Sequence, residues 1–212
     1  MLKTILAFGD NLTWGFDPAS GTRYSYEDRW PTVLQLGLGA GAQVIAEGLA
    51  GRTTAFDDHT GLPNRNGART LPISLCTHTP IDAIIFMLGN SELRTYVGNA
   101  IGAAQGMRRL IEVVRTFPYH RPYAAPSIVV IAPPRLVPTK HPELGAMFEG
   151  GVTQSERLAE RYERLALDLS VTYFDAATVA TMSPIDGAHL DVENTRALGR
   201  ALVPVLQRLL GA

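Results

Sequence analysis

Short apolar runs recur along the chain, and most are followed by a segment with apolar residues at helical spacing. Four runs are continuous rather than alternating, as expected for strands covered on both faces, and a shorter run is a plausible fifth strand. These runs cover residues 4–8, 43–46, 83–88, 127–132 and 171–174. The amphipathic segments cover residues 30–38, 100–115, 154–169 and 194–210. Alternating strands and helices predict an α/β protein, a three-layer α/β/α sandwich around a parallel sheet.

The chain shows no repeat, linker or low-complexity stretch, so we expect residues 1–212 to form a single domain. Two segments, 52–72 and 133–152, are rich in Gly, Pro, Asn and Asp and predict long loops. Long loops in a compact domain are often lids or contact surfaces. They could also be solvated excursions, or contacts that build a homo-oligomer and narrow the entrance to a site.

Composition excludes several classes of protein. The 212 residues are 46% hydrophobic and 18% charged, which fits a globular protein with a sizeable core. A net charge of -1 without charge runs gives no sign of a nucleic-acid or membrane partner. No apolar run is long enough to cross a bilayer, and the N-terminal residues lack a signal-peptide layout. The single cysteine, Cys76, excludes an internal disulfide, fits a cytoplasmic protein and is expected to be at least half-buried.

The candidate chemistry follows the strands. Asp10 and Asn11 come after the first run, Glu47 to Arg52 after the second, and Gly89-Asn90-Ser91-Glu92 after the third. The segment "DGAHL" lies just before the last helical segment. Because loops at the carboxyl ends of parallel strands converge on one crevice, residues far apart in sequence are expected to meet there.

Asp186 and His189 form the most specific pair. Three residues apart on a turn, the carboxylate can accept from the imidazole Nδ1–H and leave Nε2 free to take a proton. Taken alone, the pair could equally be a helix-capping aspartate and a surface histidine. Its combination with the three strand-end loops favours catalysis.

Two other chemistries deserve weighing. Potential metal ligands are present, and "FDDH" invites that reading: Asp10, Asp57, Asp58, His59 and His189. The segment has no fixed helical spacing, so a solvated or anchoring loop is favoured and no metal is expected. A glycosidase would need a carboxylate pair among Asp10, Glu92 and Asp186, which leaves His189 without a role.

Six segments, in order along most of the chain, resemble the motifs of the SGNH (GDSL-type) hydrolases, in particular the small arylesterase and acyltransferase branch. They read "FGDNLTWG", "EGLAGRTT", "MLGNSELR", "APP" at 132–134, "FDA" at 174–176 and "DGAHLD". The resemblance implies a flavodoxin-like fold. It also implies serine-based hydrolysis or acyl transfer on small esters with short acyl groups, without metal or organic cofactor.

Two positions depart from the family pattern. The first motif should read Gly-Asp-Ser-Leu with serine as the nucleophile, but Asn11 stands there. The third should read Gly-x-Asn-Asp with asparagine as an oxyanion donor, but Ser91 and Glu92 stand there. Gly51 matches the backbone donor of the second motif, and the Asp–His pair is unchanged. An amide nitrogen is delocalised and is no nucleophile, so activity is expected to be weak, redirected or lost.

Four hypotheses remain open. In the first, Ser91 is the nucleophile, His189 is the base, Asp186 orients it, and Asn11 with Gly51 forms the oxyanion hole. It requires roughly 2.6–3.2 Å between His189 Nε2 and the Ser91 hydroxyl. In the second, His189 activates water and Asn11 orients the ester. The third is a non-catalytic relative that binds an ester, an acetylated sugar or a protein. The fourth is an altered-site variant of an active esterase.

Neighbouring residues have expected supporting roles. Asp10 caps the following helix or anchors its loop. Trp14 and Phe16 either line the substrate pocket or pack the first helix against the sheet. Arg52 pins the loop that carries Gly51. Transfer of the acyl group to an alcohol or to peroxide is an alternative outcome if the pocket excludes water.

Overall fold

A computed structural model of the chain describes residues 2–211. Its sheet has five parallel strands in the order β2-β1-β3-β4-β5. The strands are β1 (Lys3–Gly9), β2 (Ala42–Gly48), β3 (Ala83–Met87), β4 (Ser127–Ala132) and β5 (Thr172–Asp175). This is the flavodoxin-like doubly wound order, with the switch point between β1 and β3. It confirms the predicted parallel sheet.

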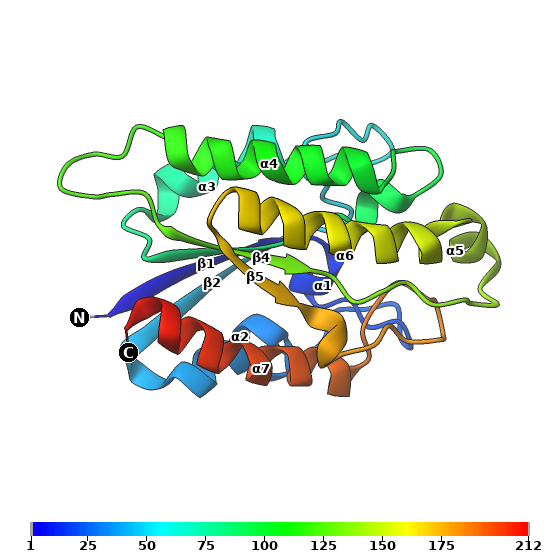
Figure 1. Cartoon of the computed structure of the whole chain (residues 1–212). Helices are drawn as coiled ribbons and strands as arrows, with labels where there is room; N and C mark the ends of the chain where they lie inside the picture. Colours follow the sequence, from blue (N-terminus) through cyan, green and yellow to red (C-terminus); the bar gives the residue numbers. More distant parts are fainter. Residues whose placement is uncertain (1, 212) are drawn as a thin grey trace.

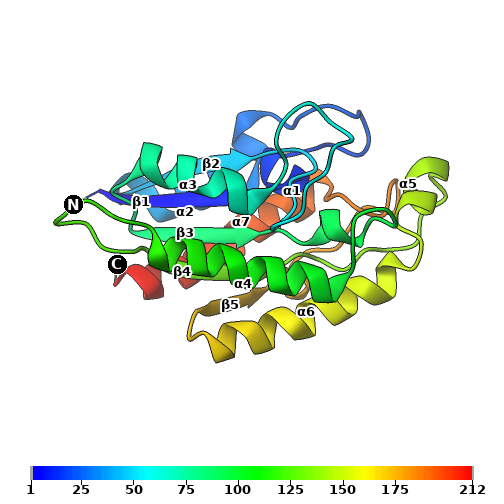
Figure 2. The ribbon, with the colours of Figure 1, turned by 90° about the horizontal axis from the view of Figure 1, so that it is seen from above.

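Helices cover both faces of the sheet. Figure 1 shows α3, α4 and α6 above it and α2 and α7 below it. The bounds of these helices are α2 (Trp30–Leu38), α3 (Gly67–His78), α4 (Ala100–Thr116), α6 (Gly151–Asp168) and α7 (Val192–Leu210). Two shorter helices, α1 (Asn11–Trp14) and α5 (Pro142–Met147), lie at the end of the sheet where the strands finish (Figure 2). The predicted three-layer architecture is therefore confirmed.

Burial follows position in the sheet. The apolar side chains of the central strands β1, β3 and β4 are buried, because helices cover both of their faces. The two edge strands, β2 and β5, are only partly buried. The expectation that residues 43–46 form a fully buried strand is wrong, because β2 has a neighbour on one side only.

The predicted loops are shorter than expected. The segment 52–72 ends at residue 66, where the Asn66 side chain accepts from the Arg69 N–H and caps α3. The segment 133–152 contains α5 and the first two residues of α6. Cys76 lies exposed on α3, so the expectation of a buried or half-buried thiol is wrong. Four 3₁₀ turns complete the chain: η1 (Tyr26–Asp28), η2 (Gly39–Gly41), η3 (Asn90–Leu93) and η4 (Ala176–Thr178).

The helices between residues 2 and 211 include none with the length and apolar character needed to cross a membrane.

Candidate active site

Three strand-end loops and the segment before α7 meet around one pocket of about 270 Å³. Asn11 follows β1, Gly51 follows β2, Ser91 follows β3, and His189 precedes α7. All four line the pocket, as the convergence of strand ends predicts. Its other lining residues are Phe16, Ala50, Arg65, Arg94, Leu144, Met147 and Phe148.

The Asp186–His189 pair is fully formed. Asp186 Oδ2 lies 2.6 Å from His189 Nδ1, and Asp186 Oδ1 accepts from the backbone N–H groups of Ala188 and His189, both at 3.0 Å. Burial acts to raise the pKa of Asp186, but the hydrogen bond from His189 and these N–H groups outweigh it and hold the pKa below its usual range. Asp186 therefore stays ionised and fixes the orientation of the His189 ring through Nδ1. The second ring nitrogen, Nε2, is not engaged by this hydrogen bond.

Two contacts hold this segment in place. Gly187 has φ +77°, and a Cβ there would lie 2.4 Å from the Val137 carbonyl oxygen. The turn between the aspartate and the histidine therefore requires glycine. On the pocket side, the Phe16 ring packs on the His189 ring with centroids 4.3 Å apart.

Asn11 and Gly51 are bonded to each other. Asp10 is buried and caps α1, its Oδ1 accepting from the Leu12 N–H at 3.0 Å. Asn11 Oδ1 accepts from the Gly51 N–H at 2.6 Å. The resemblance implies that this N–H is an oxyanion donor, and in this structure an amide oxygen of the protein accepts from it.

Ser91 lies in η3 and lines the pocket, but it is not bonded to the base. Across residues 2–211, the hydrogen-bond partner of the His189 ring is Asp186. The contact that a Ser91 nucleophile requires, from His189 Nε2 to the Ser91 hydroxyl, is therefore not formed in this structure.

Two pocket residues, Arg65 and Arg94, were missed by sequence reasoning. Arg94 donates from Nε to the Ser91 carbonyl at 2.7 Å and from Nη2 to the Gly51 carbonyl at 3.4 Å, which joins two of the converging loops. Both arginines pair with Asp58, at 2.9 Å for Arg65 and 3.1 Å for Arg94. Arg94 ends the segment "MLGNSELR", but no local pattern signals its distant partners.

These ion pairs give the "FDDH" segment an anchoring role. Asp58 binds the two pocket arginines, and Asp57 pairs with Arg69 at 3.0 Å. Within the part of the chain that the structure describes, no three His, Cys, Asp or Glu side chains are grouped in a way that could hold a metal ion.

Glu92 sits beneath the pocket wall, fully buried. Its Oε1 accepts from both the backbone N–H and the hydroxyl of Thr54, so it braces the loop after β2. Burial raises the pKa of Glu92 to about 7 and that of Asp10 to about 6. The carboxylates considered for a glycosidase are thus engaged separately: Asp10 caps α1, Glu92 binds Thr54 and Asp186 binds His189.

The structure also places Arg52, Trp14 and Phe16, for which supporting roles were expected. Arg52 pins its loop as expected, donating from Nη1 to the carbonyls of Gly9 and Glu47. Trp14 is not among the lining residues of the pocket; Arg23 stacks 5.0 Å from its ring centroid. A Cβ at Gly48 would lie 2.2 Å from the Trp14 nitrogen, so α1 packs closely on the end of β2. Of these two aromatic residues, Trp14 therefore has a packing role and Phe16 lines the pocket.

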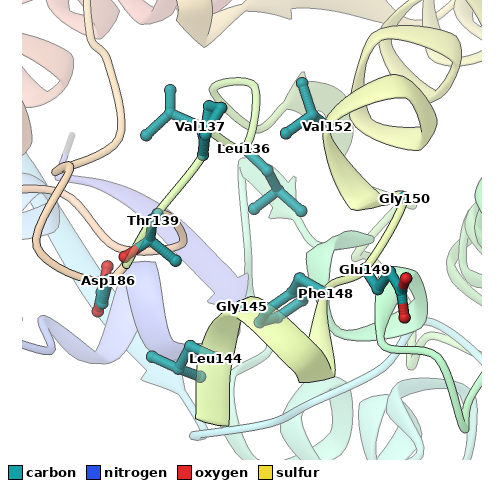
Figure 3. A pocket seen from close by; sticks show the side chains of 12 residues that line it. Leu136, Val137, Thr139, Leu144, Gly145, Phe148, Glu149, Gly150, Val152 and Asp186 are labelled. Carbon is teal, nitrogen blue, oxygen red and sulfur yellow. The ribbon is translucent and has the colours of Figure 1, made fainter. Parts of the chain in front are cut away.

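A second pocket of about 190 Å³ adjoins the dyad (Figure 3). Asp186 lies at its edge, and Leu144 and Phe148 line both this pocket and the one beside His189. The segment around α5 therefore separates two small cavities, each of which touches one member of the Asp–His pair.

The chain is similar to a known family and to several solved structures. Residues 7–195 match the GDSL-like lipase/acylhydrolase family. Among solved structures, a carbohydrate acetylesterase family member from Sinorhizobium meliloti is 49% identical over 100% of both chains, with a TM-score of 0.98. The M. smegmatis aryl esterase is 40% identical over 98% of this chain and 100% of that chain, with a TM-score of 0.93. Est24, a carbohydrate acetylesterase from Sinorhizobium meliloti, is 37% identical over 98% of this chain and 99% of that chain, with a TM-score of 0.93.

No curated protein sequence gave a significant match. The family match spans most of the chain, including the loops that carry residues 11, 51, 91 and 189. The resemblance to the SGNH hydrolases is confirmed, and the chain belongs to the GDSL-like lipase/acylhydrolase family of ester-hydrolysing enzymes.

Proposed function

We propose that the pocket at Asn11 and His189 is the active site of a carboxylic-ester hydrolase for small esters with short acyl groups, and that Asn11 keeps its turnover low. One observation carries this proposal. The Gly51 N–H already donates to Asn11 Oδ1 at 2.6 Å, beside a complete Asp186–His189 pair. The base is ready, but the place of the nucleophile and that of the oxyanion are both taken by one asparagine side chain.

In this chemistry His189 is the general base. Nε2 takes a proton from a water molecule while the water oxygen bonds to the ester carbonyl carbon, and Asp186 stabilises the resulting imidazolium. The proton then passes to the alcohol as the ester bond breaks. The carbonyl oxygen needs the Gly51 N–H, which it gains only when Asn11 Oδ1 leaves it. That competition explains why slow turnover is expected.

Acyl transfer follows the same route with an alcohol or peroxide in place of water. The apolar side chains of Leu144, Met147 and Phe148 support it, because they reduce the room for water beside the ester. Aryl and carbohydrate acetyl esters are the substrate classes suggested by the names of the similar structures.

Two alternatives each have a supporting observation. Ser91 as nucleophile is favoured by its place in the same pocket as His189. A shift of either side chain is then needed to bring Nε2 to the hydroxyl. Binding of an ester or an acetylated sugar without turnover is favoured by the closed Asn11–Gly51 contact.

The test is hydrolysis of 4-nitrophenyl acetate by the unaltered chain and by Asn11→Ser, Asn11→Ala and Ser91→Ala. In a serine-protease triad, loss of the serine costs on the order of 10⁶-fold in kcat, so we expect Asn11→Ser to raise kcat/KM by at least roughly 10³-fold. Asn11→Ala is the matched control, because it also frees the Gly51 N–H but adds no hydroxyl.

The outcomes separate the hypotheses. Residual turnover that survives Ser91→Ala and disappears in His189→Gln supports water activation by the histidine. Turnover abolished by Ser91→Ala would move the nucleophile to Ser91. A folded Asn11→Ser protein without activity contradicts the proposed function and favours binding alone.

Two expectations stay predictions. Assembly of several copies through the segments 52–72 and 133–152 is tested by light scattering, where a monomer at working concentration contradicts it. A cytoplasmic location is tested by cell fractionation.

A further inference from the structure

The pocket wall beside Gly51 is positively charged. Arg65 and Arg94 line the pocket, and no Asp or Glu among residues 2–211 does so. Asp58 pairs with both guanidinium groups, and its side chain is only 1% exposed. Although burial acts to raise the pKa of Asp58, the hydrogen bonds from Thr60 and Arg65 hold it well below its usual range. Two cations therefore share one anion, and a net positive charge is left on the wall.

The two arginines differ in what they have left to bind. The N–H groups of Arg94 all contact the protein. Nε donates to the Ser91 carbonyl, Nη1 donates to the Tyr96 hydroxyl, and Nη2 contacts Asp58 and the Gly51 carbonyl. Its interactions fix the loops that build the site. We therefore regard it as a positioning residue.

Arg65 has donors without partners. Its Nη1 binds Asp58 and Thr60, at 2.9 and 3.1 Å, but its Nε is buried and has no hydrogen-bond partner within residues 2–211. The side chain is 20% exposed. A buried donor without an acceptor is costly, so a movement of the Arg65 side chain that brings its N–H groups to an acceptor in the pocket is favoured.

Arg65 also lies beside the reacting centre. A Cβ built on Gly51 would lie 2.9 Å from Arg65 Nε and 3.0 Å from its Cζ, so the guanidinium packs directly against the residue that donates to Asn11. Phe16, Leu144, Met147 and Phe148 add apolar side chains to the lining of the same pocket. The site thus combines an apolar wall with one cation that has open donors.

From this arrangement we propose that the pocket selects esters with an apolar body and a carboxylate, and that Arg65 binds that carboxylate. The inference rests on the proposed function, since it assumes that esters occupy this pocket. A guanidinium suits the task because its planar N–H groups donate to a carboxylate in charge-assisted hydrogen bonds. Aryl acetates with a ring carboxylate are the simplest members of this class.

The catalytic test uses two substrates of the same shape. In the Asn11→Ser background, 4-acetoxybenzoate and 4-acetoxybenzamide differ in charge but hardly in size. One charge-assisted hydrogen bond predicts a preference of about tenfold in kcat/KM for the benzoate, expressed mainly in KM. Arg65→Gln should bring the ratio close to one, and Arg65→Lys should keep part of it.

Arg69→Gln is the matched control. It removes the same charge from an arginine of the neighbouring helix, but Arg69 is 63% exposed, pairs with Asp57 and does not line the pocket. The benzoate preference should survive in this variant. A preference that is absent, or that survives Arg65→Gln, overturns the proposal.

A binding test does not depend on turnover. In the unaltered chain, calorimetry with 4-hydroxybenzoate and 4-hydroxybenzamide should show a similar preference for the benzoate, lost in Arg65→Gln and reduced by added salt. Equal binding, or no binding of the benzoate, overturns the inference. If the preference is present but Asn11→Ser has no esterase activity, hydrolysis is the proposal that fails and carboxylate recognition stands.

Discussion

The two sides of the pocket differ in how ready they are for catalysis. On one side, Asp186 and His189 lie three residues apart in one turn, and their hydrogen bonds leave Nε2 uncommitted. On the other side, Asn11 and Gly51 satisfy each other. Each side holds a short hydrogen bond, but only the bond on the dyad side leaves a ring nitrogen that can take a proton. A short hydrogen bond between two pocket groups therefore identifies a fixed contact and does not by itself identify an active site.

The difference has a simple origin in the chain. The dyad comes from a single short turn, whose geometry depends on Gly187 and on the aspartate itself. The facing side is assembled from three strand ends, at residues 11, 51 and 91. A change at one of these ends leaves the dyad untouched, so the two sides can be altered separately by mutation.

The largest expected effect comes from the dyad side. In the Asn11→Ser background, Asp186→Asn should lower kcat/KM for 4-nitrophenyl acetate by about 10⁴-fold, because a neutral amide no longer stabilises the imidazolium and can select the wrong tautomer. The exposed Asp168, at the end of α6, gives the control Asp168→Asn, which should leave the rate unchanged. A loss below tenfold in a folded Asp186→Asn protein would mean that the dyad does not act in the reaction.

A smaller effect is expected on the facing side. Gly51 has φ +76°, which alanine rarely adopts, and a Cβ would lie 2.9 Å from Arg65 Nε, so Gly51→Ala strains the loop that aims the N–H and displaces the Arg65 side chain. Misplacing one oxyanion donor should cost up to about 10²-fold in kcat in the Asn11→Ser background. Assays with 4-nitrophenyl acetate and thermal melting should be run together.

The variant Gly39→Ala is a control that separates backbone strain from a change in the direction of the Gly51 N–H. Gly39 has a similar φ, +74°, but nothing lies within 4 Å of its Cβ position, and it follows α2 away from the pocket. A positive φ is unfavourable for a non-glycine residue at both positions, and at Gly39, where ψ is -165°, the backbone is essentially restricted to glycine, at a cost of about 1–3 kcal/mol. Both variants should therefore melt earlier, while only Gly51→Ala should lose rate. Equal rates in the two variants would remove the aiming role of Gly51.

The sequence could predict the features that depend on local patterns, but not those that depend on contacts between distant segments. Periodicity located the central strands and α2, α4, α6 and α7, because their burial depends on local patterns. The rule for strand ends brought residues 11, 51, 91 and 189 to one pocket. The helix α3 was missed altogether, because its first turns follow a Gly- and Asn-rich stretch and the helix contains Pro72.

Long-range contacts left no signal. The ion pair from Asp58 to Arg94 joins the loops after β2 and β3, whereas Arg65 lies in the same loop as Asp58, and no local pattern marks either pairing. The bond from Gly51 to Asn11 spans 40 residues. Phe16 rather than Trp14 lines the site because α1 ends after four residues and Gly15, at φ +90°, turns the chain. Such outcomes depend on how separate segments are brought together and cannot be read from either segment alone.

The smallest expected effect is the change of folding stability with pH. Glu92 and Asp186, on the two sides of the pocket, change this stability in opposite directions as pH rises. Below the facing side, burial raises the pKa of Glu92 to about 7, above its usual value, so the folded protein holds this proton more tightly than the unfolded chain does. This stabilisation is complete below the unfolded pKa and is lost as pH rises through about 7. Asp186 acts in the other direction, because its lowered pKa stabilises the fold at higher pH and that stabilisation is lost on acidification.

Glu92→Gln should therefore flatten the alkaline side of the stability profile. A glutamine keeps an oxygen that can accept from Thr54, as Glu92 does, but has no charge to bury. The free energy of unfolding of the unaltered protein should fall between pH 5 and 8, by at most about 1.4 kcal/mol per pH unit from this group. In Glu92→Gln the fall should be smaller, with urea melts at several pH values as the measurement. Glu160→Gln, on the exposed face of α6, should keep the profile of the unaltered protein. If Glu92→Gln and Glu160→Gln give parallel profiles, Glu92 is ionised in the folded protein across this pH range. The two sides of the pocket then differ only in the hydrogen bonds of Asn11, Gly51, Asp186 and His189, and not in how they respond to pH.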